Sequence, residues 1–233
     1  MGINKINRPN SLFELATTHI RAAIVDGSIE LGEQISELGI SQRLGISKTP
    51  VREALQELRR EGLVRIGAQR GTTVFCPDVE ELRDIFEFRT VLELAAADRV
   101  FDRKVDATAQ VLRETVEDMI AAVDRGDHRA YQALDSRFHK AIIDGAENDY
   151  LSNAYLPVSV KIDALRSRNL QDSNVVGRSL VFHGRLVDIM ARGDRAVFLE
   201  QLQTHISNSG NDSRTWLDSV KRAAPVRELS TRR

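Results

Sequence analysis

The chain has 233 residues, 42% of them hydrophobic and 29% charged, and a formal net charge of −1 at pH 7. This composition excludes a disordered or strongly charged chain, and the length favours two domains. The single cysteine, Cys76, excludes an intrachain disulfide. No apolar run approaches the roughly 20 residues that cross a bilayer, and the first residues lack the apolar core of a signal peptide. We therefore expect a cytoplasmic protein that does not contact a membrane.

The first third of the chain predicts three helices followed by a β-hairpin. Apolar residues recur at a spacing of three and four after Ser11, which forms a capping box with Glu14. Gly45 suits a tight turn between two shorter helices, because glycine tolerates a left-handed backbone. In chain order the pattern predicts helices at about 11–26, 36–44 and 47–61, strands at 63–66 and 72–75, and a turn at 67–71.

Everything after Cys76-Pro77-Asp78 has a helical pattern, so we place a domain boundary there, between residues 1–76 and 77–233. The predicted fold class is mainly α: a winged helix-turn-helix with a small hairpin wing, then an all-α bundle of six helices. The helices are expected at about 79–101, 105–125, 128–144, 148–169, 174–192 and 194–220.

The helix at 47–61 is the candidate for reading DNA. Basic side chains outnumber acidic ones between residues 43 and 70, although the whole chain is nearly neutral. The start of such a helix enters the major groove, where its dipole attracts phosphate and an Arg or Lys can read guanine. The residues crowding that start are Ser47, Lys48, Thr49 and Arg52, and Arg70 lies at the hairpin tip. On composition alone, the same residues also fit an ordinary helix start with solvated charges.

The run from Ser47 to Leu55, followed by Glu61-Gly62-Leu63-Val64 and Arg70-Gly71, closely resembles the GntR family of regulators over about residues 11–75. The resemblance implies a homodimer on a short palindromic operator in double-stranded DNA. It places these residues at the DNA: Ser47, Lys48, Thr49, Arg52 and Arg70. Many members carry arginine where this chain has Lys48, and lysine is a poorer bidentate reader, so a base contact is better supported for Arg52. Arg43 and Arg65 fit either phosphate contacts or solvated surface.

Polar side chains on the apolar stripes are the informative residues of the helical domain. His183 lies ten residues before Gly193 and His205 twelve after it, so an antiparallel hairpin would bring both to roughly 15–18 Å from the turn. Asp135 and His139 lie one turn apart on an earlier helix. Together they offer three nitrogens and one oxygen, a set suited to zinc, nickel, manganese or iron. A hydrogen-bonded core histidine is the competing interpretation for each one alone.

The helical domain also resembles the FCD effector domain of the FadR subfamily over about residues 79–220. The resemblance rests on Arg89-x-x-x-Glu93, Asp135-x-x-x-His139, His183 before Gly193-Asp194, and Thr204-His205-Ile206. The predicted number of six helices is similar to that of the VanR-like branch of this subfamily. The resemblance implies that Asp135, His139, His183 and His205 coordinate a divalent metal ion.

Arg89 lies within an apolar stripe, where a guanidinium is unfavourable unless it is paired. It fits two roles equally well: an ion pair with Glu93, or a bidentate clamp on the carboxylate of a small acid. Arg166 and Asn208 are weaker candidates for the same effector pocket.

These features favour a transcriptional regulator whose operator affinity is controlled by a small carboxylate, an organic or sugar acid, in a metal-containing helical pocket. Two rival functions use the same residues: a regulator for which the metal itself is the signal, and a helical metalloenzyme acting through metal-bound water. We expect no enzymatic activity, because an enzyme would leave the basic winged module without a purpose.

Overall fold

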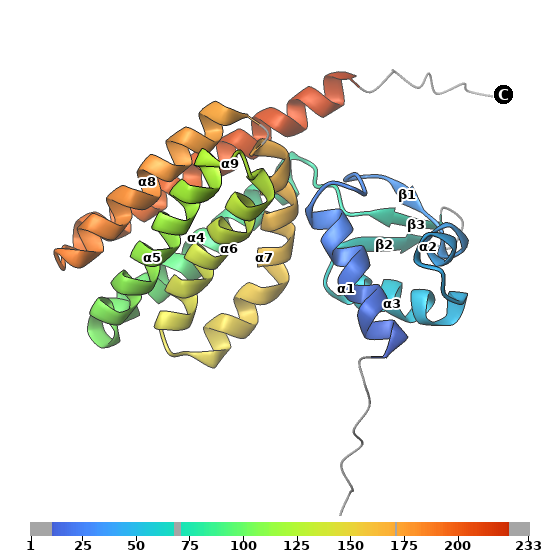
Figure 1. Ribbon diagram of the computed structural model, residues 1–233, viewed down its shortest axis with the longest axis horizontal. Helices are drawn as coiled ribbons and strands as arrows, with labels where there is room; N and C mark the ends of the chain where they lie inside the picture. The colour runs from blue at the N-terminus through green and yellow to red at the C-terminus, as the bar shows by residue number, and fades with distance from the viewer. Residues whose placement is uncertain (1–10, 68–70, 171, 224–233) are drawn as a thin grey trace, which may run out of the picture. The chain divides into compact units, whose positions relative to one another are not determined.

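The computed structural model describes residues 11–67, 71–170 and 172–223 (Figure 1). These residues divide into two compact units. The N-terminal unit contains the described residues up to Pro77 and also Leu156–Ser167, from a long helix. The helical unit contains Asp78–Tyr155 and the described residues from Arg168 onward. No helix among the described residues is both long enough and apolar enough to span a membrane.

The N-terminal unit is a winged helix-turn-helix, as predicted. Its helices are α1 Leu12–Val25, α2 Glu37–Leu44 and α3 Lys48–Arg60, and its strands are β1 Gln34–Ile35, β2 Val64–Gly67 and β3 Gly71–Val74. The capping box of α1 is present, since Ser11 accepts from the backbone of Glu14 and the Glu14 side chain accepts from that of Ser11. Gly45 ends α2 in the left-handed conformation, with φ at 66°. Val51, Leu55 and Leu58 form the buried stripe of α3, which packs on α1 and α2.

The sheet has the strand order β1-β3-β2, and both pairings are antiparallel. The predicted hairpin is β2 and β3, with Val64 opposite Val74 and Ile66 opposite Thr72. Strand β1 was not predicted, because two residues are too few to show an alternating pattern. It pairs Gln34 with Thr73 and so gives the hairpin a third strand. The tip of the hairpin, with Arg70, lies outside the described residues.

The described part of the C-terminal region is helical, again as predicted. Its helices are α4 Val79–Arg103, α5 Val105–Asp124, α6 His128–Gly145, α7 Asp149–Asn169, α8 Ser173–Ala191 and α9 Arg195–Ala223. Asp78 begins α4 by accepting hydrogen bonds from the backbone of Glu80 and Glu81. Helix α4 packs against α6 and α9, and α8 packs against α5 and α9 (Figure 1). The facing sides of α4, α6, α8 and α9 carry most of the buried polar residues of this unit.

Gly145, near the end of α6, marks a close approach of helices. A Cβ atom there would lie 2.5 Å from Thr108 Oγ1 and 3.0 Å from Val100 Cγ2. We expect Gly145→Ala to lower the unfolding free energy by about 1–3 kcal/mol, because an overpacked core must shift. Gly177→Ala in α8 is the matched control, since its methyl group would meet nothing within 4 Å beyond its chain neighbours and the backbone of its own helix. That change should stabilise the protein by about 0.5–1 kcal/mol. Urea unfolding of both variants would measure the difference, and equal effects would contradict it.

Candidate functional site

The N-terminal end of α3 is exposed from Ser47 to Thr49 and presents hydrogen-bond donors. Ser47 is the N-cap residue, but its hydroxyl makes no capping hydrogen bond within the described chain. Lys48 and Thr49 follow it, and all three side chains are exposed. Their position at the positive end of the helix dipole is suited to an anion such as a DNA phosphate. Arg43, in the last turn of α2, is exposed as well.

Arg52 extends from the same exposed part of α3, and an acidic residue of α2, Glu37, holds its side chain. Its Nε and Nη2 atoms donate to the Glu37 carboxylate over 2.8–3.2 Å. The hydrogen bond from Arg52 is the main cause that lowers the pKa of Glu37, so the carboxylate is ionised near neutral pH. Sequence analysis did not identify this partner.

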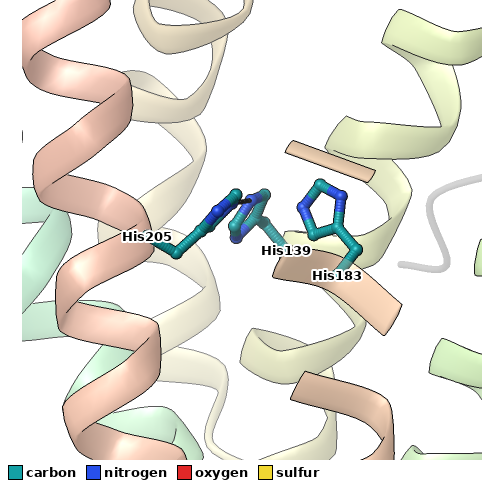
Figure 2. A group of neighbouring side chains, drawn as sticks. All are labelled: His139, His183 and His205. Atoms are coloured by element: carbon teal, nitrogen blue, oxygen red, sulfur yellow. Dashed lines mark hydrogen bonds between the residues drawn. The ribbon is translucent and has the colours of Figure 1, made fainter. Parts of the chain in front are cut away.

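Three histidines from three helices meet inside the helical unit. Figure 2 shows the imidazoles of His139 on α6, His183 on α8 and His205 on α9 facing one another. A ligand nitrogen from each lies within 4.8 Å of the others, and all three residues are buried. The His183 and His205 ring centroids are 4.6 Å apart. The structure therefore brings together the two histidines of the α8–α9 hairpin that the sequence spacing placed level.

Asp135, one turn before His139 on α6, borders the same cluster. Its Oδ1 is 3.6 Å from His183 Nε2, and its Oδ2 is 3.9 Å from His139 Nε2. Asp135 is 2% exposed. The structure thus places one carboxylate beside three imidazoles, which is a donor set typical of a divalent transition metal.

The hydrogen bonds of His139 leave its Nε2 atom as the ligand candidate. Nδ1 is 2.7 Å from Glu93 Oε2 and donates to it, so the neutral form of the ring has its proton on Nδ1. Nε2 then carries a lone pair, and it accepts a hydrogen bond from His205 Nε2 at 3.3 Å (Figure 2). Metal-binding histidines are commonly oriented in this way, by a carboxylate on the other nitrogen.

Burial lowers the pKa of His205 well below 6.5, and the neighbouring His183 and His139 lower it further. The ring is therefore neutral near pH 7. A neutral imidazole is the form that can donate a nitrogen lone pair to a metal ion, so the cluster suits a cation without first losing a proton from His205.

Glu93 on α4 joins the histidine cluster to Arg89. Besides His139, it accepts from Arg89 Nε at 2.6 Å and from the hydroxyl of Tyr155 at 2.9 Å. Burial acts to raise the pKa of Glu93, but the charge of Arg89 and the contact with His139 outweigh it, so the pKa is well below 4.5. Glu93 is therefore a fully buried carboxylate with three donors around it.

Arg89 is only partly paired by Glu93. Its side chain is fully buried, and the ion pair uses Nε. Its Nη1 and Nη2 atoms are buried and have no hydrogen-bond partner among the described residues. Two unpaired donors of a buried guanidinium are unfavourable, and they match the two oxygens of a carboxylate. Arg89 thus combines features of both predicted roles. The ion pair with Glu93 is present, and Nη1 and Nη2 remain available for a carboxylate.

The two weaker effector candidates fall in different units: Arg166 in the N-terminal unit and Asn208 in the helical unit. Arg166 is buried on α7 and donates to Asp163 at 3.2 Å. Asn208 is exposed on α9. Tyr155 was not identified from the sequence, because an aromatic residue on a helix looks like ordinary core. Glu93 was recognised only as a partner of Arg89, and its bond to His139 depends on the packing of α4 against α6.

Two family models match the chain. The model of the gntR family of bacterial regulatory proteins matches residues 14–74, and the FCD domain matches residues 84–208. The first match covers the winged helix-turn-helix, and the second covers Arg89 and all four candidate metal ligands.

Curated relatives are named as transcriptional regulators, and a solved structure has the same fold. An HTH-type transcriptional regulator from Agrobacterium vitis is 37% identical over 127 residues, which is 53% of this chain and 74% of the relative. The gluconate operon transcriptional repressor of Bacillus subtilis is 26% identical and covers 81% of this chain and 79% of its own length. A crystal structure of a GntR-type protein from Rhodococcus sp. RHA1 covers 88% of this chain and 99% of its own, with 21% identity and a TM-score of 0.77, and so shares the fold. The chain is therefore a DNA-binding transcriptional regulator that belongs to the GntR family and carries an FCD domain.

Proposed function

We propose that the protein is a homodimeric regulator whose affinity for a palindromic operator is controlled by a small carboxylate bound beside a metal ion. Residues 1–76 would bind the operator in the cytoplasm, and residues 77–233 would bind the effector and form the dimer. The observation that carries the proposal is the buried Arg89, whose two outer nitrogens lack partners among the described residues. A ligand with a carboxylate would satisfy both donors.

The metal would be held by Asp135, His139, His183 and His205, and zinc, nickel, manganese or iron all suit three nitrogens and one oxygen. When bound, the ion would attract the negative charge of a carboxylate ligand. Glu93 would act from outside the cluster, holding the His139 ring so that Nε2 faces the other imidazoles. Arg89 would orient the carboxylate through the nitrogens that Glu93 does not use, and Asn208, on α9 of the same unit, remains a candidate for the rest of the ligand.

A sugar acid is a reasonable effector class. A relative is named as a repressor of a gluconate operon, and gluconate is a hydroxylated carboxylate. Such a ligand changes DNA affinity only if it binds the two dimer arrangements with different affinities. On the DNA side, Ser47, Lys48, Thr49 and Arg52 would contact the operator, with Arg43 and the hairpin tip around Arg70 as further contacts.

Arg89→Lys tests the effector site without removing the positive charge. Lysine cannot present a planar fork to a carboxylate, so a screen of small carboxylates by thermal shift should find wild-type ligands whose shift is lost in the variant. The screen is run with the metal-loaded protein and repeated with a chelator. Metal binding by the variant, measured separately, should persist, because Arg89 contributes no ligand to the histidine cluster.

The matched control is Arg178→Lys, since Arg178 is an exposed residue of α8 paired with Asp212. It should keep the wild-type shifts. Equal carboxylate shifts in wild type and Arg89→Lys would refute the clamp.

A second candidate function makes the metal ion itself the signal. The three buried histidines favour it as much as they favour a metal-assisted effector site. The two functions differ in one measurement. If the metal is the signal, DNA affinity changes when metal is added without any organic ligand, whereas the first proposal requires a carboxylate as well.

A further inference from the structure

The pairing of Arg52 with Glu37 leaves one edge of the guanidinium free. Glu37 accepts from Nε and from Nη2, which together form the side edge of the group. A guanidinium has five N–H bonds, and Nη2 carries one on the side edge and one on the end. Nη1 makes no hydrogen bond to any residue that the structure describes. The end edge, formed by Nη1 and Nη2, is therefore available while the pair is intact.

This end edge is the one that suits guanine. Two parallel N–H groups match the O6 and N7 acceptors in the major groove, and the planar group must be held in the correct orientation for both bonds to form. The Arg52 side chain is 60% exposed, so in the absence of Glu37 it would sample many rotamers. The Glu37 carboxylate, at the start of α2, holds the plane of the Arg52 guanidinium through the edge formed by Nε and Nη2.

The ion pair between Arg52 and Glu37 contributes little to the stability of the fold. The Glu37 and Arg52 side chains are 34% and 60% exposed, and ion pairs between exposed residues contribute little to stability. A carboxylate near the DNA-facing helix also opposes binding, because it repels phosphates. Its presence beside Arg52 is easier to explain by a role in recognition.

We propose that Glu37 is a positioning residue for base recognition: it holds Arg52 so that the free edge of the guanidinium reads a guanine, at the expense of overall attraction to DNA. The inference rests on the proposed placement of Arg52 at the operator. It predicts two effects of opposite sign when the charge of Glu37 is removed. Affinity for DNA of any sequence should rise, and the preference for one base should fall.

The experiment is a selection of duplexes from a randomised pool by the full-length protein, followed by titration with random-sequence duplex at fixed salt. The wild type should select a guanine at one position of each half-site, and Arg52→Ala should abolish that preference. Glu37→Gln should lower the preference for this guanine by about tenfold, in line with the discrimination given by a good bidentate contact. Its affinity for the random duplex should rise several-fold.

Glu53→Gln is the matched control. Glu53 is an exposed acid on the same helix as Arg52, and Arg52 makes its ion pair with Glu37 rather than with Glu53. Its loss should raise the affinity for random duplex to a similar extent and leave the base preference unchanged.

The outcomes separate the inference from the proposed function. A Glu37→Gln variant that behaves like Glu53→Gln would overturn the positioning role. So would a sharper guanine preference, because it would show that Glu37 competes with DNA for Arg52. A wild-type protein that selects no sequence would instead refute operator binding itself.

Discussion

Glu93→Ala is expected to lower the unfolding free energy of the metal-free protein by about 3–5 kcal/mol, the usual effect of breaking a buried ion pair from one side. Glu93 and Arg89 are both fully buried, and Glu93 Oε1 accepts from Arg89 Nε at 2.6 Å. The substitution also removes the acceptor for Tyr155 and His139. It therefore leaves a buried positive charge and two buried donors without this acceptor. Urea unfolding monitored by circular dichroism would measure the loss.

Two variants control for this prediction. Replacing both charges, in Arg89→Met with Glu93→Ala, should recover much of the lost stability, because no isolated charge then remains in the core. Asp144→Ala removes the partner of Lys140 from an exposed pair of the same helical spacing and should lower the unfolding free energy by less than about 1 kcal/mol. If Glu93→Ala is no more harmful than Asp144→Ala, the buried pair does not stabilise the fold.

The helices and the hairpin could be predicted because their signals are local. Gly45 and Gly193 have positive φ, as the turns that the sequence indicated require. The apolar stripe predicted for α3 is the side of the helix that is buried in the structure. Strand β1 could not be predicted, since its two residues become a strand only by pairing with Thr72 and Thr73 of β3.

The candidate site was predictable where it depends on spacing along one hairpin. The distances of His183 and His205 from Gly193 follow from helical rise alone. Contacts between helices remote in the sequence could not be predicted in this way. The bond from His139 to Glu93 joins residues 46 positions apart, and the bond from Tyr155 to Glu93 spans 62. Both require knowledge of how the helices pack, as does the pair of Arg52 with Glu37 on α2.

The second large effect concerns metal binding. We expect the wild type to bind one divalent ion at the histidine cluster and His205→Ala to bind it more than about 100-fold more weakly, since loss of a residue that only orients a ligand already weakens binding by about 10–100-fold. His205 offers Nε2 within 3.3 Å of His139 Nε2, so its removal takes away one of the converging nitrogens. Competition for zinc with a chromophoric chelator at pH 7 would give both affinities.

The order of zinc affinities among three variants tests the proposed metal site more strictly than the loss of affinity in one variant. His128→Ala removes an exposed histidine at the start of α6 and should bind zinc like the wild type. Glu93→Gln keeps all four candidate ligands but weakens the acceptor that holds His139 Nδ1, so its affinity should fall by about 10–100-fold. His205→Ala should be weaker still. Circular dichroism must show that each variant is folded, because an unfolded protein would imitate the loss of a ligand. If a folded His205→Ala variant binds zinc as tightly as His128→Ala does, the three imidazoles are a packed polar core and the metal does not belong to this cluster.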